Sequence, residues 1–149
     1  MSPKGAVMIC GHGSRDERAV SQFNAMVETM KQTHLADYDV ESGFLEFAHP
    51  ILRDGFEKLK AMGHKKIYAL PGMLFAAGHA RSDIPDALAK CAAQSPGVTF
   101  RQCGPLSRAP SIIDLLSRRI GHALTTCDAA TQQTGNPAVD ASVALVMVG

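Results

Sequence analysis

The sequence lacks any marked excess of charge. It has 15 lysines and arginines against 14 aspartates and glutamates in 149 residues, so its formal net charge is +1. The basic residues are scattered rather than clustered, and the electrostatic pattern of a nucleic-acid-binding protein is therefore missing. We expect no nucleic acid among the partners of this chain.

Long apolar segments are also missing. The longest runs are Ala6–Cys10, Ala69–Ala77 and Val143–Val148. Each falls well short of the roughly 20 residues that a membrane-spanning helix needs. The N-terminus, with Pro3 and Lys4 ahead of a strand-like run, does not resemble a signal peptide. We expect no membrane partner and a cytoplasmic location.

The four cysteines show no paired spacing. Cys10, Cys91, Cys103 and Cys127 form no CxxC motif, which argues against a zinc knuckle, a redox dithiol or a disulfide framework. We interpret them as buried or idle thiols. The sequence also lacks a GxGxxG motif and a P-loop lysine, the usual signals of nucleotide binding.

What the sequence does contain is an alternation of strand and helix patterns. Expected strands cover Gly5–Gly11, Asp39–Phe47, Lys66–Leu70 and Val98–Gln102, and the expected helices run from Ser14 to about His34, from His49 to Met62, over Asp83–Ala93 and over Pro110–Leu124. These follow from apolar periodicity and capping residues. The alternation predicts an α/β fold with a parallel four-stranded sheet and helices on both faces.

The last part of the sequence changes character. Residues 125–141 are rich in Thr, Gln, Ala, Gly, Asn and Pro and are typical of a linker. Residues 142–149 then return to an apolar, strand-like run that resembles Gly5–Gly11. We predict an α/β domain over 1–124, a linker over 125–141 and an orphan strand over 142–149, which either begins a second repeat or adds to a sheet edge.

Polar residues suited to a divalent metal follow three of the expected strands. They are His12 in GHGSR, Glu46 and His49 in FLEFAHP, and His79 in FAAGHARSDIP. In open parallel sheets, ligands bind at the carboxyl ends of the strands. Imidazole and carboxylate together suit Co, Ni, Fe or Zn, and such a small set of ligands leaves an ion free to depart.

Neighbouring residues fit the same interpretation. Glycines flank His12, and Gly78 precedes His79, which leaves room for a large flat ligand beside each imidazole. Glu46, at the end of an apolar strand, is a plausible proton acceptor. Four arginines follow the loops and can receive carboxylates of an acidic substrate: Arg15, Arg53, Arg81 and Arg108. Ordinary turn histidines, a strand-end glutamate paired with an arginine, and solvated arginines are the alternatives at each position.

The three loops, taken in order, resemble those of the class II tetrapyrrole chelatases, specifically the sirohydrochlorin cobaltochelatases. GHGSR, FLEFAHP and PGMLFAAGHARSDIP carry this resemblance, which covers about residues 5–122. It implies a metal-inserting lyase whose two histidine ligands are His12 and His79 and whose acidic residue is Glu46. Arg15, Gly78 and Arg81 would contact the substrate. The segment CGPLSRAP departs from the family pattern, which has glycine where Ser107 stands.

The resemblance also implies a bilobal enzyme, built from two short chains or from one long duplicated chain. We therefore expect a homodimer, or the first half of a longer protein, that inserts Co²⁺ into sirohydrochlorin without a tightly bound cofactor. Ni²⁺, Fe²⁺ or Zn²⁺ remain alternatives to Co²⁺.

Two other functions stay open from the sequence. The first is a metal- or tetrapyrrole-binding module without turnover. The second is a flavodoxin-like phosphate or nucleotide domain that uses GHGSR as an anion loop at a helix N-terminus.

Overall fold

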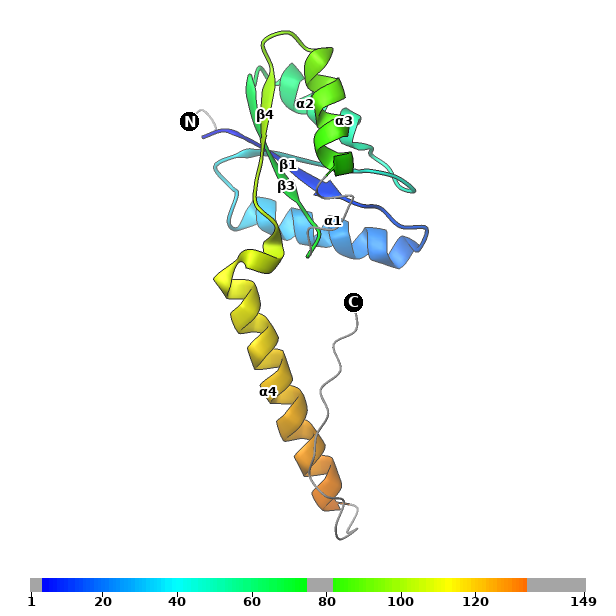
Figure 1. The fold of residues 1–149 in the computed structure, drawn as a ribbon, viewed down its shortest axis with the longest axis vertical. Coiled ribbons are helices and arrows are strands. Elements are labelled where there is room, and N and C mark those ends of the chain that lie inside the picture. The colour runs from blue at the N-terminus through cyan, green and yellow to red at the C-terminus, as the bar shows by residue number, and fades with distance from the viewer. Residues whose placement is uncertain (1–3, 75–81, 134–149) are drawn as a thin grey trace. The chain divides into compact units, whose positions relative to one another are not determined.

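The computed structural model describes residues 4–74 and 82–133 (Figure 1). It divides into two compact units, Met1–Ala109 and Pro110–Gly149. Among the described residues, the first unit contains the four strands of the sheet, three α-helices and a 3-10 turn over Leu106–Arg108. It is the unit that carries the candidate site.

The sheet has four parallel strands in the order β2-β1-β3-β4. Their bounds are β1 Ala6–Gly11, β2 Asp39–Phe44, β3 Lys66–Pro71 and β4 Thr99–Gln102. The central strand β1 pairs with β2 and β3, so that Gly11 lies opposite Phe44 and Cys10 opposite Pro71. The carboxyl ends of these three strands therefore meet at one edge, and the predicted α/β fold is confirmed.

Helices cover both faces of this sheet. Helix α1 (Glu17–Gln32) packs against the cluster that contains Ile9, whereas α2 (Leu52–Ala61) and α3 (Ile84–Ala93) pack against the cluster that contains Met8 and Cys10. Successive residues of a strand point to opposite faces, so β1 contributes to both clusters. A central parallel strand buried on both sides has to be apolar throughout, as β1 is.

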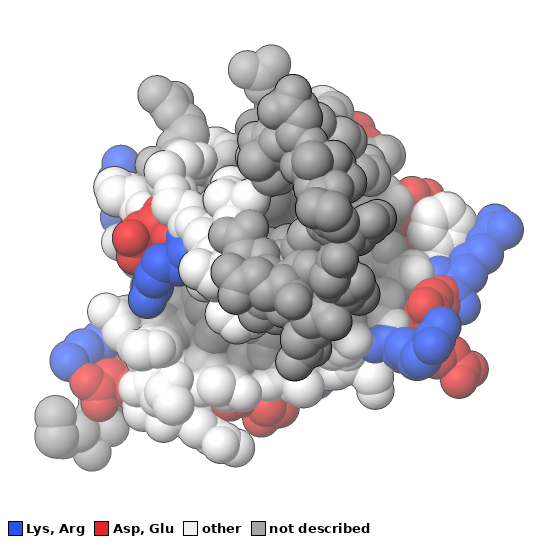
Figure 2. All heavy atoms as spheres, turned by 90° about the horizontal axis from the view of Figure 1, so that it is seen from below, with Lys and Arg blue, Asp and Glu red and all other residues white. Residues whose placement is uncertain are grey.

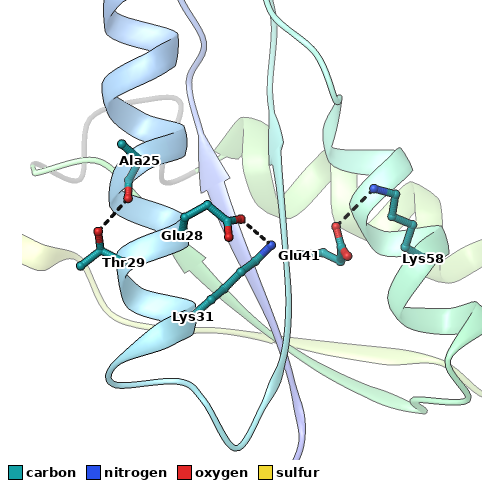
Figure 3. Close-up of polar contacts among 6 residues, drawn as sticks. All are labelled: Ala25, Glu28, Thr29, Lys31, Glu41 and Lys58. Atoms are coloured by element: carbon teal, nitrogen blue, oxygen red, sulfur yellow. Dashed lines mark hydrogen bonds and ion pairs between the residues drawn. The ribbon is translucent and has the colours of Figure 1, made fainter.

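Polar contacts at the edges of the first unit supplement these apolar clusters (Figure 3). Lys58 of α2 reaches Glu41 of β2 at 3.4 Å, while Lys31 pairs with Glu28 one turn away on α1 at 3.0 Å. The first pair joins two elements and the second lies within one. On the face drawn in Figure 2, the described lysines and arginines lie beside aspartates and glutamates rather than in a patch of one sign.

The segment after β2 differs from its prediction. The strand ends at Phe44 rather than Phe47, and α2 begins at Leu52 rather than His49. Beyond Phe44 the chain forms a loop in which Phe47 has a positive φ of 63°, and that conformation cannot continue a strand. Glu46, two residues past the end of β2, lies in a loop and not on a strand.

The second unit begins with helix α4 (Pro110–Gln133). The helix was expected to end at Leu124, and it includes the first part of the predicted linker over 125–141. The expected orphan strand over 142–149 lies outside the described residues, and the domain bounds stay a prediction. Within the part of the chain that the structure describes, no helix is both long and apolar enough to cross a membrane.

Candidate metal and tetrapyrrole site

The structure brings His12 and Glu46 together at the carboxyl edge of the sheet. The Nε2 atom of His12 lies 3.2 Å from Oε1 of Glu46, and the two side chains are 32% and 43% exposed. The other ring nitrogen, Nδ1, lies 3.2 Å from the carbonyl oxygen of Gly13. These two contacts fix the orientation of the partly exposed imidazole. Because a ring nitrogen must be unprotonated to bind a metal, an ion bound through Nε2 would take the place of the contact with Glu46.

Backbone hydrogen bonds hold the two loops of this pair in register. The Leu45 amide donates to the Gly11 carbonyl at 2.9 Å, and the Glu46 amide donates to the His12 carbonyl at 3.0 Å. These bonds extend the β1–β2 pairing beyond the last residues of both strands. The site is thus positioned by the sheet and not by loop contacts alone.

Gly13 is the point where the loops are closest. Its φ is +98°, and a Cβ atom built on it would meet the Glu46 carbonyl oxygen at 1.7 Å. No other residue has both the conformational freedom and the lack of a side chain that this place requires. The sequence predicted that Gly13 leaves room for a ligand, whereas in the structure the space beside it is filled by the Glu46 loop.

An aromatic side chain stands beside the pair. Phe47 is 53% exposed, and its ring centroid lies 6.2 Å from that of His12 with a tilt of 36°. The guanidinium carbon of Arg15 lies over the Phe47 ring, 5.0 Å from its centroid. Residues from the loops after β1 and β2 therefore form one continuous surface.

Two clefts adjoin this surface. One, of about 180 Å³, is bordered by His12, Gly13 and Phe23, and the other, of about 400 Å³, by Arg15, Phe47 and His49. Ser14 borders both clefts, so they are neighbours. His49, a candidate ligand from the sequence, thus lies with Arg15 and Phe47 around the larger of the two.

The described cysteines are poor candidates for metal ligands. Burial raises the pKa of the Cys10 thiol to about 12, although Cys10 is only two residues before His12. Burial also raises the pKa of Cys91. A thiol must lose its proton to bind a metal, and these two stay protonated at neutral pH. The interpretation as buried thiols fits Cys10 and Cys91, and Cys103 is partly exposed.

Several residues singled out from the sequence are not part of this arrangement or cannot be placed in it. Gly78, His79 and Arg81 lie outside the described residues. Arg53 borders a different cleft, of about 520 Å³, between α2 and α3. Ser107, where the sequence departs from the family pattern, donates its amide to the Leu74 carbonyl at 2.8 Å. Among the described residues, no three His, Cys, Asp or Glu side chains come together as a metal-binding cluster.

Sequence reasoning missed Phe47. Its position in FLEF fits the alternation of a strand, which hid the exposed, left-handed conformation that it adopts. A usable signal was the short spacing between Glu46 and the His49-Pro50 pair, since proline restricts the residue before it and favours a loop.

The family model described as CbiX matches residues 6–123. The chain belongs to the CbiX family. Two curated relatives of this CbiX chain are a sirohydrochlorin ferrochelatase from Bacillus subtilis (strain 168), 30% identical over 117 residues, and a sirohydrochlorin cobaltochelatase from Priestia megaterium, 31% identical over 115 residues. The matches cover 78% and 77% of the CbiX chain.

A solved structure gives the same fold. The sirohydrochlorin chelatase SirB from Bacillus subtilis subspecies spizizenii, in complex with cobalt, matches with a TM-score of 0.73 and 29% identity. The match covers 80% of the CbiX chain and 50% of SirB. The CbiX chain likewise spans 44% of the ferrochelatase and 37% of the cobaltochelatase, so it corresponds to half of these proteins or less.

Proposed function

We propose that this CbiX chain is a metal chelatase that inserts a divalent metal ion, Co²⁺ in the first instance, into sirohydrochlorin in the cytoplasm. The observation that carries the proposal is the 3.2 Å contact between His12 Nε2 and Glu46 Oε1 at the edge of the sheet. A carboxylate beside a proposed metal ligand is in reach of the protons that leave as the ion enters. Membership of the CbiX family supports the same activity.

The reaction exchanges one ion for two protons. The metal ion forms bonds to the ring nitrogens of the macrocycle, and two pyrrole nitrogens each lose a proton. In the proposal, His12 and His79 hold the ion through neutral imidazole nitrogens. Glu46, which is 43% exposed, or a histidine accepts the two protons one at a time and releases each to solvent. Arg15, Gly78 and Arg81 would contact the acidic macrocycle, the arginines by charge-assisted hydrogen bonds to its carboxylates. The exposure of His12 and Glu46 leaves the ion a way out with the product.

The identity of the metal ion is the more specific part of the proposal. Imidazole and carboxylate ligands bind Fe²⁺, Ni²⁺ and Zn²⁺ as well as Co²⁺, in an order of affinity that does not depend on the enzyme's task. The relatives named above include both a ferrochelatase and a cobaltochelatase. Parallel assays with Co²⁺, Fe²⁺, Ni²⁺ and Zn²⁺ under anaerobic conditions give the order of kcat/KM. A preference for Fe²⁺ would replace cobalt without affecting the proposed roles of the residues.

The experiment that tests the function follows the absorbance change of sirohydrochlorin on metal insertion. We expect His12→Ala and His79→Ala to lower kcat/KM for metal insertion by about tenfold or more, since each removes a ligand to the ion. Glu46→Gln keeps an oxygen near His12 but no longer accepts protons, and we expect it to lower kcat by about 100-fold. His34→Ala is the matched control, because His34 is an exposed histidine just beyond the end of α1. Unchanged rates in both histidine variants would contradict the proposal.

The alternative function is a binding module for the metal or the tetrapyrrole that does not turn over. It has a specific basis, because the chain spans half or less of the relatives named above. Binding of Co²⁺ and sirohydrochlorin without formation of the cobalt product, at any protein concentration, would select this alternative.

A further inference from the structure

Phe47 has no role in the function proposed above, yet it occupies the centre of the site. It follows Glu46 directly, its ring neighbours that of His12, and Arg15 lies over it. A phenylalanine that is 53% exposed gains little from the hydrophobic effect in this place. Its conformation therefore calls for another explanation.

The backbone holds Phe47 in a costly state. Its φ of 63° lies in the left-handed region, which is uncommon for residues other than glycine and a genuine outlier for a bulky one. The turn is closed by the Ala48 amide, which donates to the Glu46 carbonyl at 2.9 Å. Strain of this kind gathers at functional sites, where the surrounding structure enforces it. Here it presents an aromatic ring at the surface, next to His12.

The charge of Arg15 is available at the same place. No carboxylate within the described residues forms a salt bridge with Arg15, although Asp16 and Glu17 follow it directly. Asp16 instead caps α1 by accepting from the Arg18 amide at 2.9 Å, and its Oδ1 also lies 3.5 Å from Arg18 Nε. The Phe47 ring is thus the contact that the structure gives to the Arg15 guanidinium.

The larger cleft supplies the space for a ligand. Its volume is about 400 Å³, and its border combines Arg15 and Phe47 with polar side chains that include Asn24 and His49. The Glu17 carboxylate also borders this cleft, so a bound carboxylate has to lie at the Arg15 and Phe47 side of it. A carboxylate on a short alkyl arm fits such a lining: the guanidinium would pair with the charge, and the aromatic ring would contact the apolar arm. His12 borders the neighbouring cleft. A macrocycle whose carboxylate arm lies in the larger cleft would therefore have its ring beside the imidazole.

We infer that Phe47 is a positioning residue: it fixes the Arg15 guanidinium by cation–π stacking, so that the pair binds one carboxylate arm of the acidic macrocycle beside His12. This inference rests on the proposed function. It concerns recognition of the macrocycle and leaves the binding of the metal ion to other residues. Loss of the ring would release the Arg15 side chain to solvent without removing its charge.

The test is a double-mutant cycle on the full chain with two separate readouts. Phe47→Leu removes the cation–π contact and keeps an apolar side chain. We expect it to raise the KM and the Kd for sirohydrochlorin by about two- to fivefold, the range that an exposed cation–π contact supports. The Kd for Co²⁺ in the absence of macrocycle, and kcat at saturating macrocycle, are expected to stay at the wild-type values. In an Arg15→Gln background, Phe47→Leu should have no further effect on the KM. With Arg15 present, Phe47→Tyr keeps an aromatic ring and should have the wild-type KM.

A matched control comes from the second cation–π pair of the structure. Lys66 Nζ lies 5.3 Å from the centroid of the Tyr68 ring, and β3 begins at Lys66, so this pair lies toward the opposite edge of the sheet. Tyr68→Leu removes a similar contact and should leave the KM for sirohydrochlorin unchanged.

Three outcomes overturn the inference. Additive effects of Phe47→Leu and Arg15→Gln would show that the ring does not act through the guanidinium. A raised Kd for Co²⁺ in Phe47→Leu would indicate general damage to the site. If the wild-type chain neither binds nor metallates sirohydrochlorin, the proposed function fails as well, whereas an active wild-type chain with an additive cycle removes this inference alone.

Discussion

At the scale of single residues, Gly13 determines whether the two loops of the site can meet. It combines a φ of +98° with an approach to the Glu46 carbonyl oxygen that leaves no room for a Cβ atom. Gly63, after the end of α2, has a nearly equal φ of +93°, but a Cβ atom there would meet nothing within 4 Å. Both positions therefore require a left-handed backbone, but only Gly13 also requires the absence of a side chain.

We predict that Gly13→Ala is far more harmful than Gly63→Ala. Both substitutions carry the cost of a left-handed alanine, roughly 1 kcal/mol. Gly13→Ala must in addition push the Glu46 loop away, which we expect to lower the free energy of unfolding by about 3 kcal/mol or more and to abolish metal insertion. Urea unfolding and the sirohydrochlorin assay on both variants check this. Equal destabilisation by the two substitutions would mean that the close approach at Gly13 relaxes at little cost.

The sequence was sufficient to predict that His12 and Glu46 lie at the same edge of the sheet, because the ends of neighbouring parallel strands must share an edge. It was not sufficient to find Phe47. The conformation of Phe47 depends on hydrogen bonds between the loops after β1 and β2, such as that from the Glu46 amide to the His12 carbonyl. Local sequence preferences contain no information about a partner that is more than 30 residues away, as it is for this pair.

At the scale of elements, the polar contacts that join two elements differ from those within one. Glu41 on β2 is 19% exposed at the side chain and faces Lys58 of α2. Both members of the Glu28–Lys31 pair belong to α1, and the Glu28 carboxylate is 59% exposed. A carboxylate that is partly withdrawn from water loses more when its partner is removed. A surface pair one helical turn apart contributes little.

We predict that Lys58→Met lowers the free energy of unfolding by about 1 kcal/mol, and Lys31→Met by less than about 0.5 kcal/mol. Methionine keeps most of the length and apolar character of lysine, so the difference reports on the charge. Chemical denaturation at low and at physiological ionic strength checks the prediction, and added salt should narrow the gap between the two variants. A larger effect at Lys31 would contradict the assignment of Glu41–Lys58 as the stronger contact.

Element boundaries were harder to predict than element types. All four strands and all four helices occur in the predicted order, because apolar periodicity marks them clearly. β2 ends at Phe44, three residues before its predicted end at Phe47, whose positive φ is incompatible with a strand. α4 is longer than predicted since Thr, Gln and Ala after Leu124 tolerate a helix as well as a linker. Boundaries follow from backbone contacts and weak propensities, which the pattern of apolar residues does not record.

At the scale of the whole molecule, the site occupies one edge of one α/β unit. The SirB structure in complex with cobalt is about twice as long as the matched segment, since the match covers 50% of it. A flat macrocycle has two faces, and under the proposed function the loops after β1 and β2 would contact one of them. A second copy of this chain, or a second half in a longer protein, would supply the other surface, as we expected from the sequence.

We therefore predict that metal insertion requires two copies of the 149-residue chain. If the active species is a dimer, the turnover per chain falls on dilution below the dissociation constant of the dimer, whereas a self-sufficient monomer keeps it constant. Light scattering across the same dilution series gives the mass of the species at each point, so the two curves should share one midpoint. A strictly monomeric chain with full turnover at every concentration would contradict the requirement. In that case a single copy of the chain suffices for the reaction.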